Sequence, residues 1–303
     1  MKKALLICIL IIVCTMPLLA TPIQDYVYYN LKVGQLIFRE IGCMEQANQV
    51  FNYWMNGEST KGEAVKQLAS IKLEMEGTRS EMKKLEPSSD LKKLHELYLS
   101  SNDILISSVI NHRNFIEKQD LKADDIRRKL MSHLLSYIDA VYDCQVKNIA
   151  AQAEFQGTLK LEGVSTSIKD YFAWNNKVLE VMRKQVIISR DMEKLLIKLH
   201  FGDIDLEQAQ KEEKALVGEA ETLKKSVDTV NAQGDVKELN LLFVKSFDSY
   251  IDFHRDLENY LQSPSKDKSQ KLQGKSKEAN RKNFEFNEAC FKFLEKRVTK
   301  PQA

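Results

Sequence analysis

Proline and glycine are scarce in this chain, which has 5 prolines and 11 glycines among 303 residues. A many-stranded β fold needs these residues at its frequent turns, so their scarcity argues against β sandwiches and barrels. Leucine, lysine, glutamate and alanine, which all favour helices, dominate the composition instead. The sequence therefore predicts an all-α protein.

Motifs of common cofactors and active sites are also missing. The chain has no C-x-x-C-H haem attachment, no H-E-x-x-H or G-x-S-x-G motif and no glycine-rich phosphate loop. None of its five histidines completes the Glu-x-x-His motif of di-iron bundles. We therefore predict a non-enzymatic protein with no metal and no cofactor; an active site assembled from isolated side chains is the minor alternative.

A strong excess of charge of one sign is absent. The chain carries 45 Lys and Arg against 43 Asp and Glu, and two of the basic residues, Lys2 and Lys3, belong to the leader described next. Nucleic-acid-binding proteins normally show a basic excess that replaces counterions on the phosphate backbone. We therefore expect no nucleic-acid partner.

The first 20 residues, MKKALLICILIIVCTMPLLA, have the pattern of a signal peptide. Lys2 and Lys3 form a basic start, an apolar run follows, and Ala20 is a small residue at the expected cleavage point. We predict export to the periplasm or the extracellular space. A small residue is usual two positions before the cleavage point, but this chain has Leu18 there. The apolar run is also almost long enough to span a membrane. A retained N-terminal anchor is the alternative, and lipid attachment at Cys14 is a weaker one.

One stretch of sequence occurs twice. TPIQDYVYYNLKV (21–33) and TSIKDYFAWNNKV (166–178) share Thr, Ile, Asp, Tyr, Asn, Lys and Val at the same seven positions. The agreement continues without a gap, with 19 identities between residues 21–118 and 166–263. Such self-similarity indicates a duplicated structural unit whose first copy starts directly after the leader.

Each copy has the periodicity of four helices. We expect helices over about 21–56, 60–86, 90–118 and 122–160, and over about 166–201, 205–231, 235–262 and 267–298. Short loops make neighbouring helices antiparallel. The prediction is a signal peptide (1–20) followed by a tandem duplication of an up-down four-helix bundle, with repeats at 21–161 and 166–299. One elongated eight-helix stack is the alternative.

Helix-end signals recur at matching positions of the two repeats. Glycine follows the first long helix, a capping box opens the second, and aspartate precedes the third. These residues are Gly57 and Gly202, Thr60 with Glu63 and Asp205 with Gln208, and Asp90 and Asp235.

Polar residues interrupt the apolar stripes at matching positions. Such groups fix the register of bundles as a buried polar layer, or alternatively line a ligand pocket in each repeat. We expect Asn30 to meet Asp103 or Ser101, and Asn175 to meet Asp248 or Ser246. The aromatic cluster Tyr26, Tyr29, Tyr171 and Trp174 is either core with a polar rim or a surface that stacks on a ligand.

Three cysteines remain after the leader: Cys43, Cys144 and Cys290. Burial as small apolar side chains is the default for free thiols. Because Cys144 and Cys290 both lie on the fourth helix of their repeats, a disulfide between the two repeats is the alternative.

The segment from Pro264 is basic and carries Phe284, Phe286, Phe291 and Phe293. We expect its phenylalanines to complete the second bundle, while peripheral membrane contact through this basic helix is the alternative. The chain as a whole suits a non-enzymatic protein that binds another envelope or extracellular protein or acts as a structural spacer. A small-molecule or lipid-binding bundle is the runner-up.

Overall fold

The computed structural model describes residues 21–122, 125–162, 164–230 and 232–297, and within these ranges it is all-helical, with no strand. The predicted all-α class and the eight long helices are confirmed. Two 3₁₀ turns, η1 (Ser89–Leu91) and η2 (Gly234–Val236), precede the third and seventh helices. The helices are α1 (Thr21–Met55), α2 (Lys61–Lys83), α3 (Lys92–Lys118), α4 (Ile126–Thr158), α5 (Thr166–Phe201), α6 (Leu206–Asp228), α7 (Lys237–Gln262) and α8 (Lys266–Glu295).

The helix ends follow the chemistry of their terminal residues. Gly57 and Gly202 take positive φ angles of 71° and 76°, which let the chain turn out of α1 and α5 at little steric cost. Thr60 caps α2 in a reciprocal capping box with Glu63, and the Asp205 carboxylate accepts from the Gln208 N–H at 2.8 Å. These side chains satisfy backbone donors that the first turn of a helix leaves unpaired.

Asp90 and Asp235 do not cap helices as expected. They lie inside η1 and η2, and neither α3 nor α7 has a side-chain hydrogen bond at its N-cap. Asp235 instead accepts from the Ser167 hydroxyl at 2.9 Å and pairs with Arg297. The carboxylate thus joins α5 to the end of α8.

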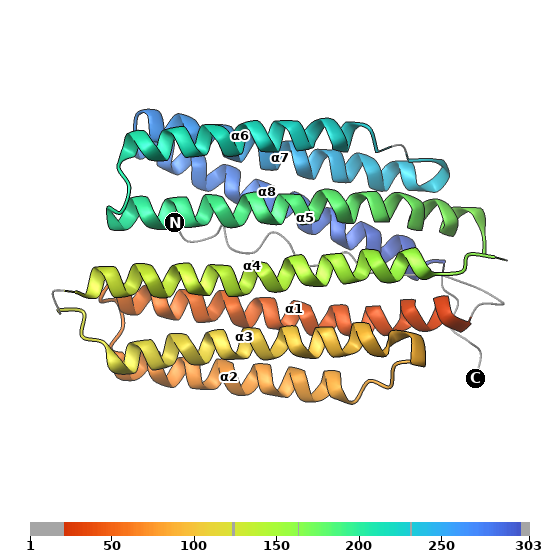
Figure 1. Ribbon diagram of the computed structural model, residues 1–303, viewed down its shortest axis with the longest axis horizontal. Coiled ribbons are helices and arrows are strands. Elements are labelled where there is room, and N and C mark those ends of the chain that lie inside the picture. The colour runs from red at the N-terminus through yellow and green to blue at the C-terminus, as the bar shows by residue number, and fades with distance from the viewer. Residues whose placement is uncertain (1–20, 123–124, 163, 231, 298–303) are drawn as a thin grey trace.

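The helices form an elongated array (Figure 1), in which α1 to α4 occupy one half and α5 to α8 the other. α4 and α5 pack extensively against each other at the middle, while α8 runs obliquely to its neighbours. One contiguous set of buried apolar side chains extends through both halves, from Tyr26 to Leu294. Smaller clusters around Met192 and Leu195 complete the interior of the second half.

Equivalent elements of the two halves start at a constant spacing. α5, α6, η2 and α7 begin 145 residues after α1, α2, η1 and α3. Side-chain contacts keep the same spacing: the Tyr29 hydroxyl lies 2.8 Å from His95 Nδ1, and Trp174 Nε1 donates to Asn240 Oδ1 at 2.9 Å.

None of the described helices combines the length and the apolar composition needed to cross a bilayer. The predicted signal peptide and its alternatives, which concern residues 1–20, lie outside the described residues.

Candidate functional site

A row of buried amides lies on one face of α4. Gln145, Asn148, Gln152 and Gln156 fall on one helical face and are 3–7% exposed. An amide buried without hydrogen bonds costs free energy, so each of these side chains needs partners on neighbouring helices. We call these four residues and their hydrogen-bonded partners the polar seam.

The seam joins α1, α3 and α5 to α4. Gln156 Nε2 donates to the Tyr26 hydroxyl at 2.9 Å, while its Oε1 accepts from Asn175 Nδ2 at 3.0 Å. Gln152 Nε2 donates to the Tyr98 hydroxyl at 2.9 Å, and that hydroxyl donates to Asn30 Oδ1 at 3.5 Å. The group around Gln156 therefore links α1 and α4 of the first half to α5 of the second, whereas the group around Gln152 joins α4, α3 and α1 within the first half.

Three of the six polar-layer residues lie in these hydrogen-bonded groups. Asn30 and Asn175 are fully buried, and the Ser101 hydroxyl donates to Asn148 Oδ1 at 2.7 Å. Ser246 is also buried. The amides of α4, which bind these residues, were not predicted, although their spacing among apolar residues is a readable signal.

The aspartates lie elsewhere. Asp103 accepts from Arg79 at 2.6 Å and Asp248 pairs with Lys224 at 3.2 Å, and both carboxylates are about half exposed. The structure therefore pairs Asn30 with Tyr98 and not with Asp103. The reason is rotational, because a residue two positions after Ser101 points about 200° away around the helix.

The four predicted aromatic residues are core. Tyr26, Tyr29, Tyr171 and Trp174 are at most 6% exposed. Tyr26 stacks on Phe155 with ring centroids 4.8 Å apart, and Tyr171 stacks on Phe293 at 5.4 Å. Their rings therefore present no open stacking surface.

The structure contains no disulfide between Cys144 and Cys290. Cys43, Cys144 and Cys290 are all free and buried, and Cys144 Sγ donates to the Ser101 carbonyl at 3.7 Å. Burial raises the pKa of the Cys43 and Cys144 thiols to about 11 and that of Cys290 further. All three are thus held as unreactive thiols at neutral pH.

Three buried glutamates were not predicted. Glu40 accepts from Asn102, Glu193 accepts from the Tyr142 hydroxyl at 3.0 Å, and Glu213 Oε1 lies 2.8 Å from His254 Nδ1. Burial raises the pKa of all three carboxyls, to about 7 for Glu40 and about 8 for Glu193. Each sits on a different pair of helices, so they do not form one acid–base centre.

Two histidines meet in the first half. His112 Nδ1 lies 2.8 Å from His133 Nε2, and His112 Nε2 lies 3.2 Å from Asn48 Oδ1. Desolvation lowers the pKa of both rings, that of His133 to about 4, so they are neutral at physiological pH. No group of three or more His, Cys, Asp or Glu side chains suited to a metal ion occurs in the described part of the chain.

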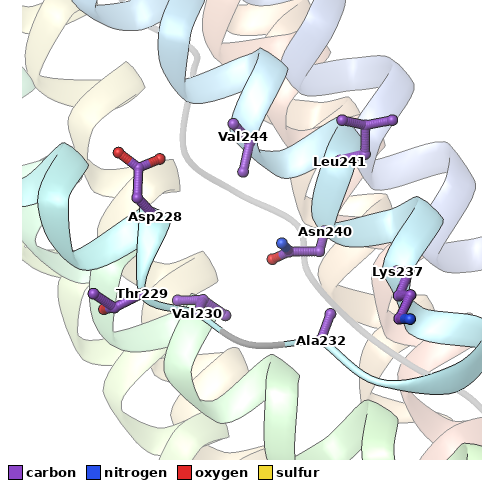
Figure 2. A pocket seen from close by; sticks show the side chains of 8 residues that line it. All are labelled: Asp228, Thr229, Val230, Ala232, Lys237, Asn240, Leu241 and Val244. Carbon is purple, nitrogen blue, oxygen red and sulfur yellow. The ribbon is translucent and has the colours of Figure 1, made fainter.

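Open depressions lie on the surface, away from the seam. Figure 2 shows one of about 380 Å³ where α6 ends and α7 begins, with Leu241 and Val244 projecting from α7 and Asp228 from α6. Asn240 on its wall already accepts from Trp174. A second depression, of about 390 Å³, runs between α1 and α2.

Lysines of the basic helix α8 form ion pairs with acidic side chains of α7. Lys271 pairs with Asp256 at 2.6 Å, and Lys275 pairs with Asp252 at 3.3 Å. Phe286 is fully buried, whereas Phe284 is 56% exposed and its ring lies 6.3 Å from that of Phe38. Packing and ion pairing within the second half therefore occupy much of this helix.

Comparison of the chain with protein-family models, with curated proteins and with solved structures found no match. Its function has to be inferred from its residues.

Proposed function

We propose that this chain is a non-enzymatic helical-bundle protein of the cell envelope or the extracellular space, which binds another protein or spaces components apart. The observation that carries the proposal is the polar seam. One of its amides, Gln156, hydrogen-bonds to Tyr26 of the first half and to Asn175 of the second, and this bond supports a stiff connection between the halves.

Ion pairs between α4 and α5 support the same conclusion. Lys194 lies 2.9 Å from Asp139, and Arg190 lies 3.3 Å from Asp143. The 35 residues of α1 span about 52 Å at 1.5 Å per residue, so the body is long as well as stiff. A long rigid body suits a spacer or an extended interaction surface.

The two halves are proposed to be a tandem duplication of one up-down four-helix unit, at 21–161 and 166–299. The 145-residue spacing of helix starts and the matching bonds of Tyr29 and Trp174 support this. So do the ion pairs of Arg79 with Asp103 and Lys224 with Asp248, which occur at the same spacing.

Export is proposed from the leader pattern and from the start of the repeated stretch at Thr21. Mass spectrometry of the protein from the envelope fraction tests it, with a mature N-terminus at Thr21 as the expected result. An intact Met1 on the exported chain would favour the retained anchor.

Rigidity is tested by distance measurement between the halves. Spin labels at Ser80→Cys and Glu219→Cys, both at exposed positions, should give one narrow distance distribution in the chain that starts at Thr21, whose own three cysteines are buried. A broad or double distribution would contradict a spacer. Photo-crosslinking in the envelope from Leu73, which is 66% exposed, tests the interaction, with a discrete protein adduct as the expected product.

A ligand-binding bundle is the second candidate, because the seam keeps unpaired polar atoms. Asn30 Nδ2, Gln152 Oε1 and Asn175 Oδ1 are buried without a hydrogen-bond partner. Native mass spectrometry separates the candidates: a bound small molecule or lipid favours this one, and a bare mass of the folded chain favours the first.

A further inference from the structure

The depression between α1 and α2 has an unusual lining for so charged a protein. α1 contributes Gln46, Gln49 and Tyr53, and α2 contributes Gln67 and Ser70. All five side chains are neutral and carry hydrogen-bonding groups, although 29% of the residues of the chain are charged. We call this depression the neutral groove.

Apolar side chains form the floor of the neutral groove. Val50 and Ile71 are 7% and 6% exposed and belong to the core. Gln49 Nε2 donates to the Tyr53 hydroxyl, and both side chains line the groove. The groove has a volume of about 390 Å³ and is open to solvent.

The second half provides an internal comparison. Residues 145 positions after Gln46, Gln49, Tyr53 and Gln67 are all charged: Asp191, Lys194, Lys198 and Glu212. Lys194 binds Asp139 of α4, and Asp191 pairs with Arg190. The second half therefore uses this face for ion pairs at and beside its junction with α4.

The floor is apolar in both halves, since Leu195 and Leu216 stand 145 residues after Val50 and Ile71. Packing of the two helices thus requires the floor but not the neutral rim. At four positions of this face the first half has neutral residues where the second half has charged ones.

We propose that the neutral groove binds a neutral carbohydrate. Amide and hydroxyl groups can both donate to and accept from sugar hydroxyls, and an aromatic ring can pack on the C–H face of a pyranose. A charged rim would have to shed its hydration on binding an uncharged ligand, whereas a neutral rim avoids most of that cost. This site is independent of the protein-binding or spacer function proposed above.

The test uses the full chain and three neutral tetrasaccharides, built from glucose, from mannose or from N-acetylglucosamine. Saturation-transfer NMR and calorimetry should detect one of them with a dissociation constant below about 10 mM. Gln49→Lys with Tyr53→Lys, which installs the residue types of Lys194 and Lys198, should weaken binding at least about tenfold.

The chain offers a matched control. Tyr28→Lys with Gln35→Lys makes the same two substitutions at exposed positions of α1 away from the groove, and should leave binding unchanged. Gln46→Asp with Gln67→Glu is a second groove variant whose added charges have the opposite sign, and it should weaken binding as well. Circular dichroism checks that each variant is folded.

Several results would overturn the proposal. They are no binding of any of the three sugars up to about 10 mM, binding that survives both groove variants, or equal weakening by the Tyr28 and Gln35 control. Binding of a neutral Gly-Ser hexapeptide at the groove, with none of the sugars, would assign the groove to a peptide and also overturn it.

Discussion

Glu193 makes the stability of this protein depend on pH in a predictable direction. Its carboxyl is buried between α5 and α4, accepts one hydrogen bond from Tyr142, and has its pKa raised by desolvation from 4.5 to about 8. The unfolded chain ionises near 4.5, so the stability contributed by the protonated group is complete below that pH and is lost as pH rises through 8. At about 1.4 kcal/mol per pH unit, the loss approaches about 4–5 kcal/mol.

Glu193→Gln keeps an acceptor for Tyr142 and removes the titration. The unfolding free energy of the variant should match that of the parent near pH 5 and exceed it by several kcal/mol near pH 9, because only the parent has to ionise residue 193. Glu40 and Glu213 titrate equally in both proteins, so their contributions cancel in this difference. Urea unfolding followed by circular dichroism at several pH values measures the difference.

Glu180→Gln, an exposed position on the same helix, controls for the lost charge and should change stability by less than about 0.5 kcal/mol. A difference between parent and Glu193→Gln that stays constant from pH 5 to pH 9 would show that the folded protein holds Glu193 ionised, and would refute the reasoning.

Three further outcomes test the structure. Gln156→Leu strands the Asn175 amide and removes a partner of Tyr26, so thermal unfolding should show a loss of about 2–4 kcal/mol; an unchanged melting temperature would mean that water replaces the amide. Thr60→Ala removes the cap of α2 and should cost about 0.5–2 kcal/mol in urea unfolding, with Thr60→Ser as the control that restores it. Maleimide labelling with peptide mapping should leave the three buried cysteines unmodified in the native protein and modify them in denaturant; native labelling at Cys144 would contradict its burial.

Helix positions were predictable because several local signals agree at each end. The run after Thr60 has a capping box, a periodic apolar stripe and a proline beyond its end, and the structure places α2 at Lys61–Lys83. The predicted end near residue 86 was too late, because the helix tightens into a turn in which the Lys84 N–H donates to the Glu81 carbonyl and the Leu85 N–H to the Met82 carbonyl. Asp90 was expected to cap α3. It lies instead inside the 3₁₀ turn η1, and Leu91 stands at the N-cap of α3 without a side-chain hydrogen bond.

The interior polar residues were only partly predictable. Asn30 and Asn175 interrupt an apolar stripe, and that pattern correctly indicates burial. Their hydrogen-bond partners depend on which way each side chain of a neighbouring helix points around its helix axis. The prediction compared only the positions of residues along the helix axes, and so it chose Asp103 where the structure has Tyr98 bonded to Asn30. The amides of α4 have no counterpart 145 residues on, where Cys290, Phe293 and Arg297 stand, so a search for shared features passes over them.

Differences between the two halves explain why the array joins at its middle. α4 meets α5 through Asp139 with Lys194 and Asp143 with Arg190. The same contact between α8 and α1 would set Phe284 against Gln49 and Glu288 against Glu45.

Phe284 and Gln49 are both uncharged and could not form an ion pair. Glu288 and Glu45 would bring two negative charges together, which is unfavourable. α8 accordingly follows an oblique path (Figure 1) and pairs its lysines with α7. The face of α1 that corresponds to the junction face of α5 contacts α8 through the rings of Phe38 and Phe284, and the ion pairs found between α4 and α5 have no counterpart there among the described residues. Gln49 therefore takes no part in an ion pair like that of Lys194 with Asp139. A neutral residue at this position of the neutral groove is compatible with the proposed binding of an uncharged ligand.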